Sequence, residues 1–210
     1  MSDWTEYLKF MAAVFSVTNP FGVVPVFITL TAGYSRQERK STARRTSLAF
    51  ACVMIVILLA GDPLLGFFGI TVSSFKAAGG IIILLMAISM VHAKVSRVKQ
   101  TTEEAEDAAD KASIAIVPLC TPLLAGPGAM STVIVYSHQG TSATHYLVLG
   151  GGILVVSVSI WLCLVSAPYI AKLLGRTGMN VVMRIMGLVL AAIGVEFIAQ
   201  GFMEMIGTGL

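Results

Sequence analysis

Long stretches without a charged side chain alternate along the chain with short clusters of charged residues. Residues 10–35, 46–61 and 77–93 contain no Asp, Glu, Lys or Arg. We expect a helix in each stretch, and the second helix should continue past Pro63 to about Phe68. Because a membrane-spanning helix needs roughly 20 mostly apolar residues, the first half of the chain predicts three spans.

The second half of the chain predicts three more spans. Residues 112–171 lack charged side chains over a length sufficient for two crossings, and the polar run 137–142 marks the turn between them. The last span should cover about residues 182–203. The pattern as a whole therefore predicts an all-α integral membrane protein of six transmembrane helices.

The composition indicates that lipid surrounds most of this chain. It is 56% hydrophobic and 12% charged, with a mean hydropathy of +0.87, whereas a soluble domain carries about a quarter charged residues. We expect a single transmembrane domain over residues 1–210, without a cofactor, a metal site or a nucleic-acid partner. Asp3 and Glu6 precede Lys9, so the N-terminus lacks the basic opening of a cleavable signal peptide.

The placement of Lys and Arg orients the predicted spans. Twelve of the 14 basic residues fall in three segments, 36–45, 94–111 and 172–184, which are expected to be loops on the same side of the membrane. Because cytoplasmic loops carry an excess of Lys and Arg, that side is predicted to be the cytoplasm. Both termini then lie outside, and residues 95–111, which include several acidic residues, form a charged cytoplasmic linker.

The two halves of the chain carry similar features in the same order. The matched pairs, at offsets of 105 to 108 residues, are 19–22 with 126–129, Pro63 with Pro168, 69–71 with 175–177, and 76–79 with 184–187. We predict two three-helix repeats, residues 1–94 and 112–210. Because three is odd, the second repeat must cross in the opposite sense, an inverted arrangement that recurs in secondary transporters. The alternative is that membrane helices simply use Gly and Pro often.

The predicted first and fourth helices contain Pro and Gly well inside the span. Residues 18–25 read Thr-Asn-Pro-Phe-Gly-Val-Val-Pro, and Pro122 is followed at 125–131 by Ala-Gly-Pro-Gly-Ala-Met-Ser. Proline removes a helical hydrogen bond and clashes with the preceding turn, and glycine makes an unwound turn accessible. Unpaired backbone at that depth is tolerated only against protein or a water-filled cavity, so we expect both breaks to meet at the centre.

Two facing breaks suit a small zwitterion. Half-helix N-termini offer N–H donors to a carboxylate, and the opposing ends leave carbonyl oxygens for an ammonium group. Kinks that serve packing alone are the alternative, and Ser131 could equally bond its own helix backbone. The predicted substrate-binding residues are Thr18, Asn19, Pro20, Phe21, Gly22, Ala125, Gly126, Pro127, Gly128, Ala129 and Ser131.

Four runs of the sequence resemble one known family. Residues 17–27 (VTNPFGVVPVF), 122–129 (PLLAGPGA), 184–187 (RIMG) and 194–198 (GVEFI) are similar to the MarC family of bacterial inner-membrane proteins, within the LysE-type exporter superfamily. The resemblance covers nearly the whole chain. It implies a multi-pass protein of the bacterial inner membrane and, for at least some members, transport of small neutral amino acids such as glycine or alanine.

Glu196 places a carboxylate inside the predicted last span. It lies twelve residues beyond Arg184, about 18 Å along a helix at 1.5 Å per residue. A carboxylate at such depth is costly and is a candidate proton carrier. A structural carboxylate bonded to a neighbouring helix is the alternative. Lys76 and Arg184 are expected to extend to the headgroups.

These features favour a secondary transporter that moves neutral amino acids by alternating access, coupled to protons or another ion. A channel, or a structural or regulatory membrane protein without amino-acid transport, is the alternative. An enzyme is not expected, because no Ser/His pair or His-Glu-x-x-His motif is apparent. The substrate, the direction of transport and the oligomeric state stay open.

Overall fold

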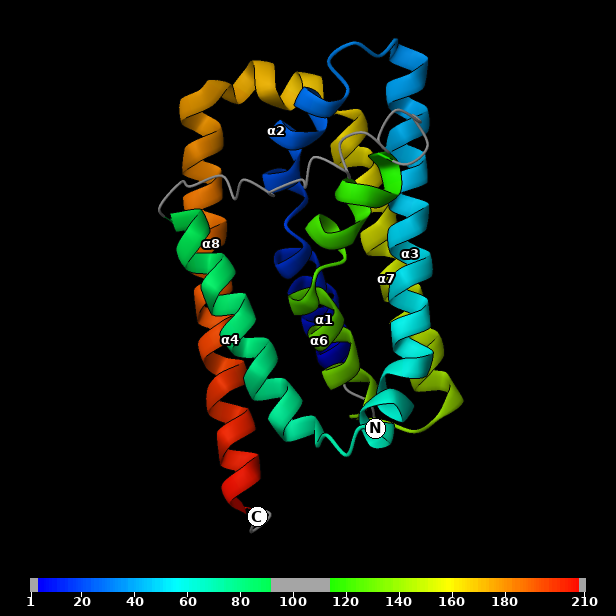
Figure 1. The fold of residues 1–210 in the computed structure, drawn as a ribbon, viewed down its shortest axis with the longest axis vertical. Coiled ribbons are helices and arrows are strands. Elements are labelled where there is room, and N and C mark those ends of the chain that lie inside the picture. Colours follow the sequence, from blue (N-terminus) through cyan, green and yellow to red (C-terminus); the bar gives the residue numbers. More distant parts are fainter. Residues whose placement is uncertain (1–3, 92–113, 208–210) are drawn as a thin grey trace.

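The computed structural model describes residues 4–91 and 114–207, and Figure 1 shows their fold. The predicted linker at 95–111 lies outside the described residues. The elements are α1 (Trp4–Thr18), α2 (Pro20–Leu30), α3 (Arg36–Phe67), α4 (Val72–Val91), the π-helix η1 (Ala115–Leu124), α6 (Pro127–Ser137), α7 (Ala143–Val165) and α8 (Ala167–Gly207).

Five helical segments in the described part are long and apolar enough to cross a membrane. They are α1 with α2, then α3, α4 and α7, and the part of α8 from Thr177 to Gly207. The pair η1 and α6 is not among them, because each of these helices is only 10 or 11 residues long. The all-α class and the membrane-spanning character are thus confirmed.

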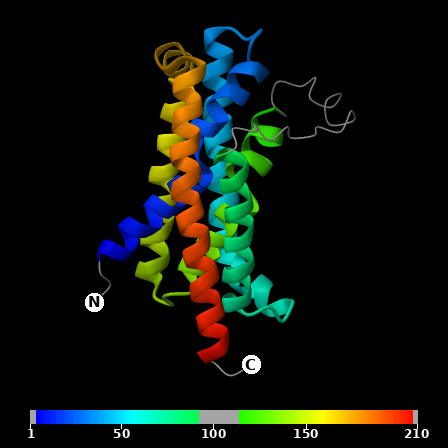
Figure 2. The same cartoon turned by 90° about the vertical axis from the view of Figure 1, so that its left-hand side faces the viewer.

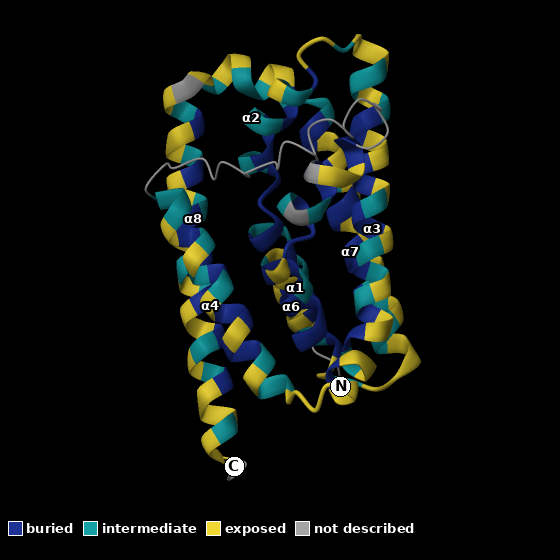
Figure 3. Cartoon of the chain, in the orientation of Figure 1, coloured by how far each residue is buried: buried dark blue, intermediate teal, exposed yellow. Residues whose placement is uncertain are grey.

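Large apolar side chains cover the outside of the bundle. Leu59 on α3, Leu85 on α4 and Leu188 on α8 are 62%, 60% and 63% exposed, and Figure 3 shows exposed positions along these helices. A water-soluble protein rarely exposes so much contiguous apolar surface. Lipid must therefore be the medium around these helices.

The basic segment at 36–45, expected as a loop, is helical instead. Ser35 and Glu38 form a capping box, in which Ser35 N–H donates to Glu38 Oε2 at 2.7 Å and Glu38 N–H donates to Ser35 Oγ at 3.3 Å. These bonds satisfy backbone groups that would otherwise be unpaired at the start of a helix. α3 consequently begins about ten residues before the charge-free stretch that predicted it.

The segment at 172–184, also expected between two helices, belongs to α8. Its first turns run across one end of the bundle and its remainder runs along the bundle (Figures 1 and 2). Gly175 separates the two parts, with a φ of 59°. Glycine adopts this backbone conformation without the penalty that a side chain would bring.

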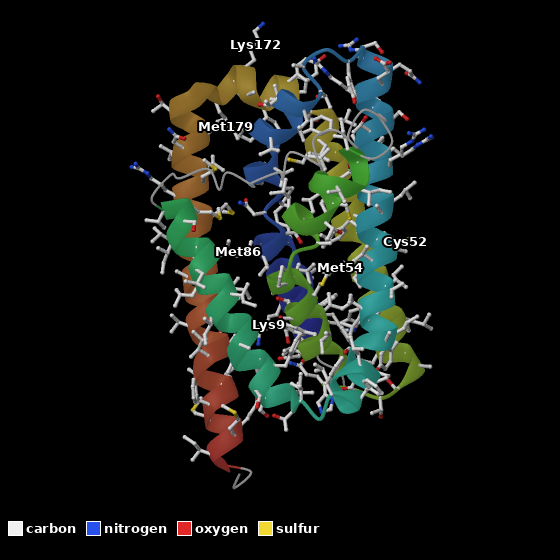
Figure 4. The ribbon with its side chains drawn as sticks, viewed as in Figure 1. Lys9, Cys52, Met54, Met86, Lys172 and Met179 are labelled. Atoms are coloured by element: carbon white, nitrogen blue, oxygen red, sulfur yellow. The ribbon has the colours of Figure 1, made fainter. Side chains whose placement is uncertain are left out.

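The helices form two pairs on either side of a centre of broken helices. α4 packs along α8, α3 packs along α7, and α1 and α2 lie with η1 and α6 between the pairs. The described chain ends, Trp4 and Gly207, lie at the same end of the bundle, and Lys172 lies at the opposite end (Figures 1 and 4).

Small residues set the close approach of α4 and α8. Gly187, Gly194 and Gly201 recur every seven residues on α8. A Cβ added at Gly194 would lie 2.9 Å from the carbonyl oxygen of Gly80, and one at Gly201 would lie 2.7 Å from the backbone nitrogen of Ala77. Membrane helices associate through such contacts because apolar side chains gain little by leaving lipid.

We expect Gly194→Val to destabilise the protein, because its methyl groups would overlap the α4 backbone. Overpacking of this kind costs about 1–3 kcal/mol. Thermal unfolding of the purified protein in detergent should show a lower midpoint for this variant. Gly151→Val on α7 is the control, since a Cβ at Gly151 meets no atom within 4 Å; equal midpoints for the two variants would contradict the packing argument.

Candidate functional site

The first break is a one-residue interruption between α1 and α2 at Asn19. Asn19 has a left-handed backbone, with φ 44° and ψ 66°, a conformation that Asn adopts more readily than most residues with side chains. Its Oδ1 accepts from Gly22 N–H at 3.4 Å, and its Nδ2 donates to Met90 Sδ at 3.5 Å. The side chain therefore caps α2 and ties the break to α4.

The second break extends over a longer stretch. Val117 and Thr121 are extended inside η1, and each precedes a proline, which disfavours the helical conformation of the residue before it. Ala125 N–H donates to Cys120 O at 2.7 Å, and α6 then begins at Pro127 after an extended Gly126. The sequence predicted an interruption around 126; the rule for residues before proline would have added Val117 and Thr121.

The two breaks differ in how the following helix is capped. Asn19 caps α2, whereas none of the described side chains caps α6. The first N–H groups of a helix have no partner within it, and Pro127 itself has no N–H. The start of α6 is therefore the better of the two helix N-termini for holding an anion.

A cavity of about 110 Å³ lies at the first break. Thr18, Asn19 and Gly22 line it together with apolar side chains of α2, α4, η1 and α8. Thr18 is 2% exposed, and its Oγ1 has no hydrogen-bond partner among the described residues. A buried hydroxyl without a partner is costly, so Thr18 offers an unused donor and acceptor beside this cavity.

Gly128 connects the second break to the same cavity. A Cβ at Gly128 would lie 3.1 Å from Val17 Cγ1 and 3.7 Å from Met86 Sδ, and Val17 and Met86 both line the cavity. We call this cavity the central cavity. Two of the residues that line it, Val17 and Met86, thus also lie beside the start of α6. The sequence did not indicate Met86, Met90 or Met183 as lining residues, because apolar residues on a membrane helix look alike whether they face lipid, protein or a cavity.

The other predicted site residues lie near the breaks without lining this cavity. Phe21 packs edge-on against Phe15, with ring centroids 6.2 Å apart. Ser131 is buried against Gly79 of α4. Pro127 is exposed, and the remaining residues are buried in the packed centre: Pro20, Ala125, Gly126 and Ala129.

A second cavity, of about 420 Å³, lies between α1, α6 and α8 and is also lined by Lys76 of α4. Lys9 and Ser16 of α1 line it, as do Tyr136 of α6 and Glu196 of α8. Lys9 and Met86 lie along the space between the α4–α8 pair and the central helices in Figure 4. Ser16 lines this cavity and Val17 lines the central cavity, so consecutive residues of α1 contribute to the two cavities.

Charged side chains of both signs line this second cavity. The Lys76 side chain is 8% exposed and its Nζ pairs with Glu204 Oε1 at 2.7 Å, so it does not extend freely to headgroups as predicted. Glu196 is exposed on the cavity side, and its Oε1 accepts from Gln200 Nε2 at 3.0 Å. Within the described residues, the hydrogen-bond partner of Glu196 is thus on its own helix, rather than on a neighbouring one.

The family follows from comparison with known proteins. Residues 4–206 match the family described as "MarC family integral membrane protein". The chain belongs to the MarC family. The expected resemblance is thereby confirmed over nearly the full length of the chain.

Relatives of this MarC-family chain come from distant organisms. UPF0056 membrane protein YhcE of Escherichia coli is 38% identical over 95% of this chain and 93% of its own length. UPF0056 membrane protein MJ1677 of Methanocaldococcus jannaschii is 37% identical over 95% of this chain and 97% of its own length. UPF0056 membrane protein YvbG of Bacillus subtilis is 36% identical over 92% of both. No solved structure matches the chain.

Replacing Asn19 separates its backbone role from its side-chain role. Asn19→Ala and Asn19→Gly both lose the side-chain bonds to Gly22 and Met90, but only Asn19→Ala also loses the tolerance for a left-handed backbone. Left-handed backbone costs a residue with a Cβ roughly 1–2 kcal/mol. We therefore expect Asn19→Gly to unfold at a higher temperature than Asn19→Ala in detergent. The reverse order would contradict the observed conformation.

Proposed function

We propose that this MarC-family protein is a secondary transporter for small neutral amino acids. The observation that supports this most directly is the central cavity at the break after Thr18, together with a larger cavity that is lined by earlier residues of α1, such as Lys9. A carrier by alternating access needs a small site near the middle of the membrane with a path to one side at a time.

The size of the central cavity supports a small substrate. An apolar cavity of about 150 Å³ holds a benzene molecule. A space of about 110 Å³ therefore suits a molecule of about five or six non-hydrogen atoms, as in glycine or alanine. A larger amino acid would need the methionines at 86, 90 and 183 to move, which their flexible side chains allow.

The charge around the central cavity supports a substrate without net charge. Its described lining residues carry no ionised side chain. A zwitterion could instead place its carboxylate toward the uncapped start of α6 and its ammonium group toward the last carbonyls of α1, where the helix dipoles are favourable. Thr18 Oγ1 would supply a neutral hydrogen bond.

The same proposal includes six spans in two inverted repeats. α1 packs on α7 as η1 packs on α3, and α2 packs on α8 as α6 packs on α4. An offset of 107 residues also carries Gly80 to Gly187 and Ala87 to Gly194, and Gly80 contacts Gly194 while Gly187 contacts Ala87. A two-fold axis relating the halves would produce this exchange of contacts.

We further propose that the end with Lys172 faces the cytoplasm and that both termini face outside, in a bacterial inner membrane. Support comes from the first turns of α3, which are rich in basic residues. They lie at the same end of the bundle as Lys172, away from both termini. Lys9 and Lys76, which line the second cavity, would then face the outside. That cavity would be the outer vestibule of the carrier.

Thr18→Val should weaken transport without weakening the fold. The change removes a hydroxyl that lacks a partner, so stability should stay equal or rise. Loss of one neutral hydrogen bond to substrate, worth about 0.5–1.5 kcal/mol, should raise the KM for glycine or alanine up to about tenfold. Uptake of labelled substrate into proteoliposomes measures this effect.

Thr46→Val is the matched control for Thr18→Val. Thr46 is also buried, and its Oγ1 also lacks a partner among the described residues, but it does not line the central cavity. Its KM should stay at the wild-type value. An equal KM for both variants would show that Thr18 is not part of the site. If folded wild-type protein gave no more flux than empty vesicles for a broad panel of amino acids, the carrier proposal itself would be wrong.

Glu196 is proposed as the proton-coupling residue, because its carboxylate lines the outer vestibule. Glu196→Gln cannot lose or gain a charge, so uptake should no longer respond to an imposed proton gradient, while exchange of labelled for unlabelled substrate should continue. Glu6→Gln is the control, since Glu6 does not line the vestibule and forms an exposed pair with Lys9 at 3.3 Å. Equal stimulation of wild type and Glu196→Gln by the gradient would exclude this role.

A further inference from the structure

A third cavity, of about 420 Å³, lies at the end of the bundle opposite the termini. Arg36, Arg39 and Lys40, at the start of α3, form its charged side. Val165 of α7 and Pro168 of α8 form an accessible apolar side above the buried Phe27 and Leu164, and Tyr169 of α8 lies beside both sides. These residues belong neither to the proposed transport path nor to the helix breaks.

The charged residues that the structure describes around this cavity are all basic. None of the described residues that line it is acidic. Arg39 donates from Nε and Nη2 to the carbonyls of Thr31 and Ala32, at 3.0 and 3.2 Å, and so helps to end α2. The ammonium group of Lys40 forms no hydrogen bond or ion pair within the part of the chain that the structure describes. Like charges gathered around a cavity repel each other, and a bound anion would relieve that repulsion.

Glu38, the one carboxylate in this turn of α3, does not line the cavity. Glu38 accepts from Ser35 N–H at 2.7 Å within the capping box. Arg36 Nη2 donates to the Tyr169 hydroxyl oxygen at 2.8 Å, which leaves the Tyr169 O–H free to donate in turn. Arg36, Lys40 and Tyr169 together present donors that suit the oxygens of a phosphate group.

The apolar side indicates that the anion carries a hydrocarbon chain. The first turns of α8 lie across this end of the bundle (Figure 2), and Tyr169 there is 64% exposed. Tyrosine is enriched at the level of the lipid headgroups, where one end of its ring is apolar and the other is wet. Val165 and Pro168 offer apolar contacts beside the cations, which a free phosphate ion would not use.

We propose that this cavity binds an anionic phospholipid, with its phosphate at Arg36, Lys40 and Tyr169 and its acyl chain against Val165 and Pro168. Basic pockets between membrane helices on the cytoplasmic side bind such headgroups. The lipid would join the start of α3 to the α7–α8 junction, since the cavity is lined from all three helices. Bound lipid should therefore stabilise the packing at this end of the bundle.

Purified full-length protein in detergent allows a direct test with phosphatidylglycerol, phosphatidylcholine and inorganic phosphate as separate additions. We expect phosphatidylglycerol alone to raise the midpoint of thermal unfolding in a saturable way. Lys40→Gln should weaken the apparent affinity for phosphatidylglycerol several-fold, and Arg36→Gln with Lys40→Gln about tenfold or more. Lys40→Gln breaks no contact within the described residues, so it should fold normally.

Arg44→Gln with Arg45→Gln is the matched control, because both arginines are exposed on α3 and neither lines the cavity. It removes the same charge from the same helix and should change the affinity less than twofold. Equal weakening by the two double variants would overturn the proposal in favour of nonspecific surface attraction. Equal stabilisation by phosphatidylcholine would exclude recognition of the anion, and equal stabilisation by inorganic phosphate would exclude a lipid ligand.

Discussion

Backbone hydrogen bonding in lipid is the constraint on which the rest of this structure depends. A peptide group without a partner in the hydrocarbon region costs several kcal/mol, so a helix can be interrupted only where other groups replace the lost bonds. At Asn19 the side chain of the same residue does this, and at Ala125 a bond to Cys120 O does it. The helices packed around the breaks then shield the remaining unpaired backbone groups from lipid.

Packing divides the described helices into firm and adaptable parts. The contact of α4 with α8 depends on glycines against backbone, an arrangement that leaves little room for rearrangement. The central cavity is lined instead by methionines of α4 and α8, whose side chains adapt to different contents. A carrier needs both properties, because rigid pairs must move as units around a site that changes shape.

The sequence predicted the positions of the helix breaks well, because proline and glycine act through local backbone geometry. It was less accurate for α3, which begins at Arg36 because a capping box outweighs the polarity of its first turns. The candidate site was only partly predictable. Thr18, Asn19 and Gly22 do line the cavity, while Phe21 and Ser131 pack against other side chains instead.

The sequence by itself determined the membrane class, the helix interruptions and the family, since each depends on composition, local backbone preference or similarity along the chain. Only the tertiary structure decided which side chains share a cavity and which are paired. Lys76 and Glu204 form an ion pair across 128 positions of sequence, and Arg36 meets Tyr169 across 133. Such contacts depend on how helices pack in three dimensions, and the apolar pattern of a membrane helix leaves its rotation toward lipid or toward its neighbours undetermined.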